Sequence, residues 1–147
     1  MIKTWEDSEA EFKKMIDAMG KKAYLHRITD TKEVNRGKMR GQKVIVKKTP
    51  ADWILTYDGR MFYAEVKFCS NKTSFPLSAL TEGQSVALIR QRAAGGQYKI
   101  FVYHSVTDTW YIITETRVQI TEESGRKSIP WKELEYAKWK DFRYIPT

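Results

Sequence analysis

The dipeptide Asp58-Gly59, which separates two runs rich in apolar residues, constrains this chain more than any other feature. Asp-Gly between such runs is typical of a two-residue turn that joins two antiparallel strands. With these residues as the turn, Tyr57 pairs with Arg60, and counting back along both strands places Asp52 directly opposite Glu65. The pattern therefore predicts a hairpin that brings an aspartate and a glutamate face to face.

This facing pair of carboxylates needs a positive charge nearby. Side chains opposite each other in antiparallel strands lie roughly 4.5–5.5 Å apart at Cβ, and two negative charges at that distance are destabilising. A divalent metal ion is the obvious cation, and Lys67 adds an ammonium on the same strand face as Glu65. Such a constellation suits metal-assisted phosphodiester cleavage. The alternative is an ordinary exposed strand, since Glu-x-Lys occurs by chance in many proteins.

The strand that carries Glu65 has two different sides. One side is uniformly apolar and consists of Phe62, Ala64, Val66 and Phe68. The alternation of strand side chains makes this the expected core side. The other side places Met61 and Tyr63 in line with Glu65 and Lys67, which predicts a cleft rather than open solvent.

Charge points to a polyanionic partner. The chain has 147 residues, enough for one domain, and its 26 Lys and Arg against 18 acidic residues give a formal net charge of +8. Such an excess favours nucleic acid first and a membrane surface second, the alternative being a soluble protein that is merely basic. Cys69 is the only cysteine, which suits a reducing cytosol, and no apolar run is long enough to span a bilayer. We therefore expect a cytoplasmic protein without membrane association.

Apolar spacing and turn residues divide the chain into helices and strands. A helix is expected from about Ser8 to Met19, with Ser8 as N-cap and Glu11 completing a capping box. The remaining expected elements are strands at 23–28, 98–104 and 110–114, a helix within 77–94 and a short helix at 131–139. The order is αββαβ with additions, which favours an α/β sandwich around a mixed sheet.

Two motifs resemble a known family. Asp52 followed by Glu65-Val66-Lys67 resembles the P-D…(D/E)-x-K signature of restriction-endonuclease-like nucleases, with one residue between Pro50 and the aspartate. The segment 71–77, Asn-Lys-Thr-Ser-Phe-Pro-Leu, closely resembles the segment at the same place in RecU-type Holliday junction resolvases. Their first-helix pattern is also present, and consists of Glu9, Phe12, Ile16 and Gly20. The resemblance covers roughly residues 5–105 and leaves the tail outside it.

The resemblance implies a restriction-endonuclease-like αβββαβ core, a mixed central sheet flanked by helices. With the length of the chain, it predicts a single nuclease domain over 1–147, with a basic insert at about 29–48 in place of a larger stalk. The tail outside the resemblance is then a C-terminal extension at about 117–147. The implied cofactor is Mg²⁺, with Mn²⁺ as an expected substitute. Its implied ligands are Glu9, Asp52, Glu65 and the backbone carbonyl of Val66.

Two further catalytic roles follow from the same resemblance. Lys67 would orient the attacking water or stabilise developing negative charge. Gln84 heads the helix after the motif, where family members often carry a glutamine near the active site. A solvent-facing helix residue is the alternative reading for Gln84.

DNA contacts are expected from two polar segments. Lys72, Thr73 and Ser74 are suited to holding the phosphate backbone without reading sequence. The densest basic run includes Arg36, Lys38, Arg40, Lys43 and Lys48. We expect this run to insert into a junction or to follow the DNA backbone. The alternative interpretation is a solvated loop.

These features together predict an Mg²⁺-dependent, structure-selective endonuclease, most simply a Holliday junction resolvase in a bacterial cell or phage-infected host. Because a four-way junction has approximate two-fold symmetry, a homodimer that makes two symmetric nicks matches it. One alternative is a nuclease of the same fold that acts on duplex, flap or single-stranded DNA. Another is a non-catalytic DNA-binding module, against which the intact Asp52, Glu65 and Lys67 argue.

Overall fold

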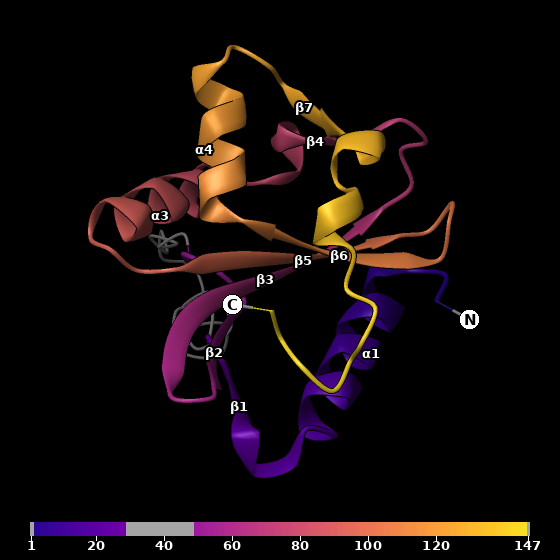
Figure 1. Ribbon diagram of the computed structural model, residues 1–147, viewed down its shortest axis with the longest axis vertical. Coiled ribbons are helices and arrows are strands. Elements are labelled where there is room, and N and C mark those ends of the chain that lie inside the picture. The colour runs from indigo at the N-terminus through magenta and orange to yellow at the C-terminus, as the bar shows by residue number, and fades with distance from the viewer. Residues whose placement is uncertain (1, 29–48, 147) are drawn as a thin grey trace, which may run out of the picture.

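The computed structural model describes residues 2–28 and 49–146, and a five-stranded sheet runs through its middle (Figure 1). The helices are α1 (Trp5–Asp17), α3 (Glu82–Ala93) and α4 (Glu115–Glu123). The strands are β1 (Ala23–Arg27), β2 (Trp53–Tyr57), β3 (Arg60–Cys69), β4 (Ser74–Pro76), β5 (Tyr98–His104), β6 (Thr109–Thr114) and β7 (Ser128–Pro130). Short 3₁₀ turns cover Gly20–Lys22, Leu77–Ala79, Trp131–Glu133 and Glu135–Ala137.

The large sheet is mixed. Its strand order is β1-β2-β3-β5-β6, with β3 and β5 parallel and all other neighbours antiparallel. The parallel pair requires a crossover connection, and α3 is the helix that makes it. β4 and β7 form a separate two-stranded sheet, which joins the segment after β3 to the C-terminal tail.

The predicted hairpin is confirmed in turn and register. Asp58 and Gly59 both have positive φ, at 48° and 79°, which is the conformation of a type I′ turn. Tyr57 pairs with Arg60 and the last ladder pair is Trp53 with Ala64, so the next step along the two strands is the Asp52–Glu65 pair.

The N-cap of α1 is Thr4, four residues before the Ser8 that the sequence pattern predicted. The hydroxyl of Thr4 accepts from the backbone N–H of Asp7, and the Asp7 carboxylate accepts in return from the backbone N–H of Thr4. Ser8 and Glu11, the expected pair, have the same spacing as Thr4 and Asp7. They do not form the capping box, because Ser8 lies inside the helix and is buried.

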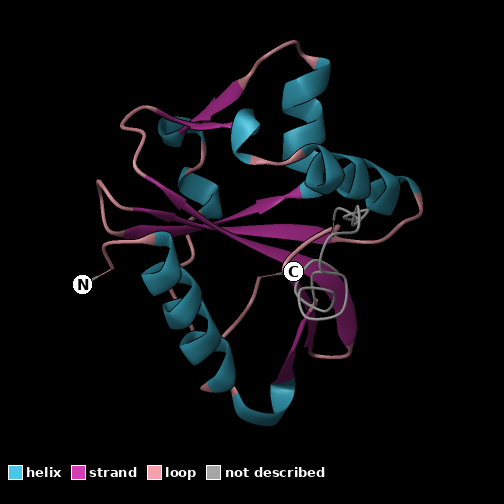
Figure 2. Cartoon of the chain, turned by 180° about the vertical axis from the view of Figure 1, so that it is seen from behind, coloured by secondary structure: helices cyan, strands magenta, loops and turns pink. Residues whose placement is uncertain are grey.

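The sheet is covered on both faces, with α1 below it and α3 and α4 above it in Figure 1, an arrangement also visible from behind in Figure 2. On the α1 face, Phe62 and Ala64 pack against Phe12 and Ile16, as the apolar side of β3 predicted. The cluster on the α3 and α4 face includes Tyr98, Ile100, Val102, Leu88 and Val118. Because both faces are packed, Glu65 in the middle of β3 is buried rather than exposed.

The C-terminal tail packs against both faces of the large sheet. Its expected helix over 131–139 is wrong, because two 3₁₀ turns occupy this stretch. Trp131, Leu134 and Ala137 recur every three residues and are all buried, which matches the three-residue repeat of a 3₁₀ helix. Trp139 packs on Phe101 from the opposite face of the sheet. No helix among residues 2–28 and 49–146 is long and apolar enough to cross a membrane.

Candidate active site

Asp52 and Glu65 are joined by a direct hydrogen bond. The backbone N–H of Asp52 donates to Oε2 of Glu65 at 3.0 Å, and the backbone carbonyl of Asp52 accepts from the N–H of Ile28 at 2.9 Å. The ammonium of Lys67 lies 3.4 Å from the other oxygen of Glu65. The structure therefore brings together the three residues that the hairpin arithmetic selected.

The electrostatics of this group call for a cation. The side chain of Glu65 is 2% exposed, and burial, followed by the charge of Asp52, raises its pKa to about 8, although Lys67 acts in the opposite direction. An ionised Glu65 is therefore costly at neutral pH without more positive charge. In the described part of the chain, no group of three or more His, Cys, Asp or Glu side chains is placed to hold a metal. A carboxylate pair fits Mg²⁺, which keeps several waters and needs only one or two carboxylates.

Tyr98 fixes the chain just before Asp52, a role that no sequence pattern predicted. Its hydroxyl donates to the backbone carbonyl of Pro50 at 2.7 Å, and the residue is fully buried. Burial and the charges of Glu65 and Asp52 raise the pKa of the Tyr98 phenol, so it stays a hydrogen-bond donor. Tyr98 therefore holds the motif segment against β5 from a position 48 residues away.

Glu9 lies beside the candidate site rather than in one acidic cluster with Asp52 and Glu65. Its carboxylate pairs with the guanidinium of Arg27, the last residue of β1. That guanidinium also lies over the ring of Trp53, 4.8 Å from its centre, and Trp53 is the neighbour of Asp52. The expected metal-binding role of Glu9 stays a prediction.

The side chain of Gln84 caps the N-terminus of α3. Its side-chain oxygen accepts from the backbone N–H of Thr81 at 2.9 Å, which completes the capping box of α3, and the residue is buried. This contact rules out the solvent-facing alternative but leaves a catalytic role as a prediction. Val66 is half-buried and pairs with Phe101 of β5, and the role of its carbonyl also stays a prediction.

The segment that begins at Asn71 is anchored by its backbone. The side chain of Asn71 accepts from the N–H groups of Thr73 and Ser74, while its carbonyl accepts from Nε1 of Trp131 and Nε2 of His104, both at 2.8 Å. The segment is therefore fixed to the tail and to β5. Lys72 is exposed on its surface. The other expected DNA contacts lie outside the described residues; they are Arg36, Lys38, Arg40, Lys43 and Lys48.

A mixed sheet with flanking helices, on which an aspartate, a glutamate and a lysine lie together, is the arrangement of the restriction-endonuclease-like class. The family model described as Recombination protein U (RecU) matches residues 3–145, so the chain belongs to this family of Holliday junction resolvases, which are endonucleases. The match extends beyond 5–105, so the expectation that the tail lies outside the family resemblance is wrong.

A solved structure supports the fold. The chain is similar to Hjc, a Holliday junction resolvase from the archaeal hyperthermophile Archaeoglobus fulgidus, with a TM-score of 0.50 and 14% sequence identity. The match covers 92% of this chain and 90% of that one. At this identity the likeness confirms the predicted fold class alone. A search of curated protein sequences gives no match.

Proposed function

We propose that this chain resolves four-way DNA junctions by Mg²⁺-dependent hydrolysis at Asp52, Glu65 and Lys67. The observation that carries the proposal is the buried carboxylate of Glu65, which lies against Asp52 and 3.4 Å from the ammonium of Lys67. A buried acid beside a second acid destabilises the folded state, and such pairs are concentrated at functional sites.

Each residue of the group has a distinct role. Asp52 and Glu65 hold the cation, with the carbonyl of Val66 and the carboxylate of Glu9 as further ligands, directly or through water. When bound, the ion lowers the pKa of a coordinated water and neutralises charge on the phosphate. Lys67 donates hydrogen bonds to the attacking water or to the oxygen that gains negative charge. Mn²⁺ would substitute for Mg²⁺, because the ligands are all oxygens.

DNA is held by groups around this centre. Lys72, Thr73 and Ser74 follow β3, the strand that bears Glu65 and Lys67, and would contact phosphates. The basic residues Arg36, Lys38, Arg40, Lys43 and Lys48 would follow the DNA backbone or enter the junction. Gln84, at the head of α3, would support the reacting groups from the first α-helix after β3.

A homodimer would place two such centres on one junction. The net charge of +8 on each chain suits a polyanion with two equivalent cut positions. A two-fold symmetric dimer matches the approximate symmetry of a four-way junction, so the two nicks would fall at symmetric positions. Each protomer would be one nuclease domain over 1–147, with its insert at 29–48 and its extension at 117–147.

The decisive experiment compares cleavage of a four-way junction, a flap and a linear duplex of related sequence, with Mg²⁺ or with EDTA. We expect junction cleavage at least tenfold faster than cleavage of either other substrate, and none in EDTA. Equal rates on all three would remove the resolvase assignment and leave a nuclease of broader substrate choice.

Isosteric variants test the residues themselves. Asp52→Asn and Glu65→Gln should each lower Mg²⁺-dependent cleavage at least a hundredfold while junction binding in EDTA persists, because charge is lost and shape is kept. Asp58→Asn in the hairpin turn and Glu122→Gln on α4 are matched exposed controls that should cleave normally. Full activity in both site variants would overturn the assignment, and a wild-type protein that binds but never cuts would indicate a non-catalytic module.

A further inference from the structure

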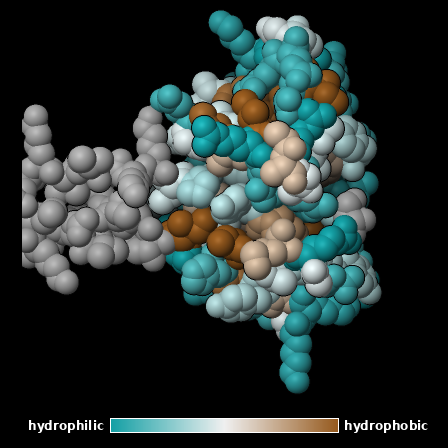
Figure 3. Space-filling model, turned by 90° about the vertical axis from the view of Figure 1, so that its left-hand side faces the viewer, coloured by the Kyte–Doolittle hydropathy of each residue, from teal (hydrophilic) through white to brown (hydrophobic). Residues whose placement is uncertain are grey.

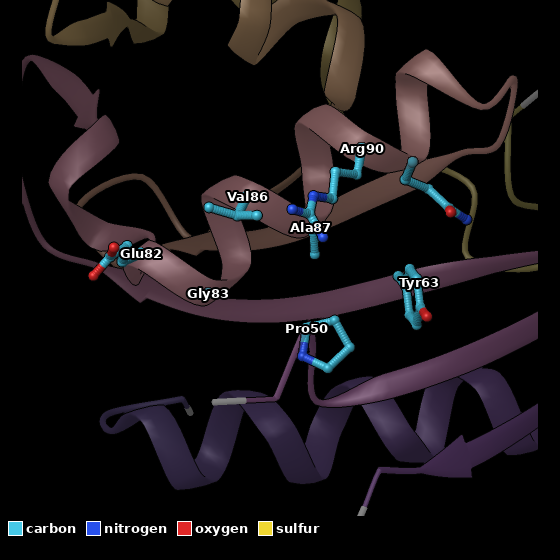
Figure 4. Close-up of a pocket in the computed structure, with 8 residues that line it drawn as sticks. Pro50, Tyr63, Glu82, Gly83, Val86, Ala87 and Arg90 are labelled. Atoms are coloured by element: carbon cyan, nitrogen blue, oxygen red, sulfur yellow. The ribbon is translucent and has the colours of Figure 1, made fainter. Parts of the chain in front are cut away.

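A cavity of about 480 Å³ lies between α3 and the strand that carries Glu65. In Figure 4, α3 forms one wall and the opposite wall comes from Pro50 and Tyr63. The α3 residues that line it are Glu82, Gly83, Val86, Ala87, Arg90 and Gln91. Its size falls in the range of small-molecule sites, roughly 300–1,000 Å³. Figure 3 shows the side of the molecule on which α3 lies, where hydrophobic patches (brown) lie among hydrophilic surface (teal).

Both residues on the sheet side of the cavity are close in sequence to a proposed metal ligand. Pro50 is two residues before Asp52, and Tyr63 is two residues before Glu65 on the same face of β3. Two residues of strand span about 7 Å, so the Tyr63 ring starts roughly one nucleotide-sized step from Glu65. Tyr98 ties the two together, because its hydroxyl bonds to the Pro50 carbonyl and its ring lies 6.0 Å from that of Tyr63.

The lining combines a flat aromatic surface with an exposed guanidinium. Val86 and Ala87 face the Tyr63 side across the cavity, and they leave most of its wall apolar. Arg90 is exposed and makes no ion pair with any residue in the described ranges. The amide nitrogen of Gln91 donates to the carbonyl of Gln97, which leaves its oxygen for another donor.

This lining fits a nucleotide better than a bare anion or a metal ion. A nucleobase has an apolar face that stacks on aromatic rings and a polar edge that pairs with amides, whereas an anion alone has no use for an apolar wall. Glu82 and Arg90 are eight residues apart, about 12 Å along the helix, so the positive end of the cavity is distinct from its acidic end. A guanidinium is suited to the phosphate of the same nucleotide.

We propose that this cavity receives an unstacked base of the cut strand next to the scissile phosphodiester, with the base on Tyr63 and its phosphate on Arg90. The inference rests on the proposed function and adds a source of substrate choice. Removing a base from a duplex stack is costly, and it costs least where pairing is already interrupted, as at a branch point. The cavity therefore favours branched DNA over continuous duplex without reading sequence.

The test is a set of junctions in which a single abasic site replaces each nucleotide around the cut position mapped with the wild-type protein. Cleavage rates are measured with Mg²⁺ for the wild type and for Tyr63→Leu, Tyr63→Phe, Arg90→Gln and Arg92→Gln. Arg92 is the matched control, because it lies on the same helix and its substitution removes the same charge outside the cavity lining.

We expect one abasic position to slow the wild type about tenfold and Tyr63→Leu to slow the intact junction by a similar factor, with little further loss when the two are combined. Because Tyr63→Phe keeps the ring, it should retain the wild-type sensitivity to the abasic position. Arg90→Gln should lose about tenfold, and Arg92→Gln less than threefold. Multiplied losses for Tyr63→Leu and the abasic site would overturn the inference.

The outcomes separate this inference from the proposed function. A wild-type protein that cleaves junctions with Mg²⁺, but shows no sensitive abasic position, retains the nuclease assignment and rejects the cavity. A wild-type protein that cleaves no DNA rejects the nuclease assignment itself. Circular dichroism and binding to the intact junction in EDTA identify a variant that has merely failed to fold, and in that case Arg90→Gln on the exposed helix surface decides the matter.

Discussion

The backbone N–H of Asp52 donates to the side chain of Glu65 at 3.0 Å, so the two acidic residues of the motif are linked backbone to carboxylate. The carbonyl of the same residue is held by Ile28, whose N–H donates to it. Asp52 is therefore held through its backbone on both sides, by Glu65 at its N–H and by Ile28 at its carbonyl. This arrangement keeps a buried acid in a site where the fold alone would favour an apolar residue.

The raised pKa of Glu65 predicts how stability depends on pH when no divalent metal is present. The folded-state pKa of about 8 lies above the ordinary value of 4.5, so the folded state binds more protons than the unfolded state between these values. The free energy of unfolding should therefore be highest below about pH 4.5, as far as Glu65 contributes, and should fall as pH rises to 8. Urea unfolding in EDTA at pH 5, 6, 7 and 8 measures this slope.

Glu65→Gln should remove the decline, because an amide does not titrate. Each unit of pKa shift corresponds to about 1.4 kcal/mol, so the gain at pH 8 should exceed 1 kcal/mol. Glu122→Gln on the surface of α4 is the matched control and should leave the slope in place. Equal slopes in the wild type and Glu65→Gln would show that Glu65 is ionised in the folded protein across this range.

Tyr98→Phe should lower both stability and catalysis, because it removes the donor to the Pro50 carbonyl and leaves that oxygen without its partner. An unsatisfied buried group costs about 1–3 kcal/mol. Since Pro50 is two residues before Asp52, we expect kcat to fall about tenfold while KM for the junction stays near its original value. Steady-state cleavage rates and urea unfolding measure the two effects.

Tyr103→Phe is the matched control for this prediction. Tyr103 is also buried on β5, and its hydroxyl donates to the carboxylate of Asp108 in the turn before β6. We expect this variant to lose stability without losing kcat. If both variants reduce kcat equally, the effect of Tyr98→Phe reflects general loss of stability rather than the position of Asp52.

Local sequence patterns were sufficient for the hairpin and for much of the sheet. Asp58-Gly59 determines the turn through the positive φ of both residues, and the turn then sets the register that joins Asp52 to Glu65. Residues 98–104 form the expected strand without error, because all seven are buried and no turn residue interrupts them.

Other features depend on contacts that no local pattern records. α4 was not predicted because its buried residues are Val118 and Thr121, while Ile120 is exposed, so it has no apolar stripe. The Tyr98–Pro50 hydrogen bond and the Glu9–Arg27 ion pair join residues far apart in the sequence. The sequence therefore predicted the acidic pair at the site but not the groups that support it.

Glu9 and Arg27 should affect metal affinity in opposite directions if Glu9 is a ligand of the proposed ion. Glu9→Gln removes a carboxylate and should weaken Mg²⁺ binding severalfold. Arg27→Gln removes the guanidinium that competes for that carboxylate, so it should strengthen Mg²⁺ binding. Titration calorimetry with Mg²⁺ alone measures both, with Glu6→Gln on the exposed side of α1 as control. Unchanged affinity in both variants would limit the pair to a structural role, worth about 0–1 kcal/mol at a half-exposed position.

Leu134→Ala should show that the tail belongs to the folded core. Leu134 is fully buried in the cluster that covers the α3 and α4 face, although it lies after every strand of the large sheet. Loss of such a side chain typically costs about 2–5 kcal/mol, because the cavity left behind closes only in part. Tyr136→Ala, two residues later on a side chain that is 71% exposed, is the control and should change stability by less than about 0.5 kcal/mol. Urea unfolding, followed by tryptophan fluorescence, measures the free energy of unfolding of both variants. If both substitutions changed it equally, burial of Leu134 would contribute nothing to stability, and the tail would lie outside the cooperative unit.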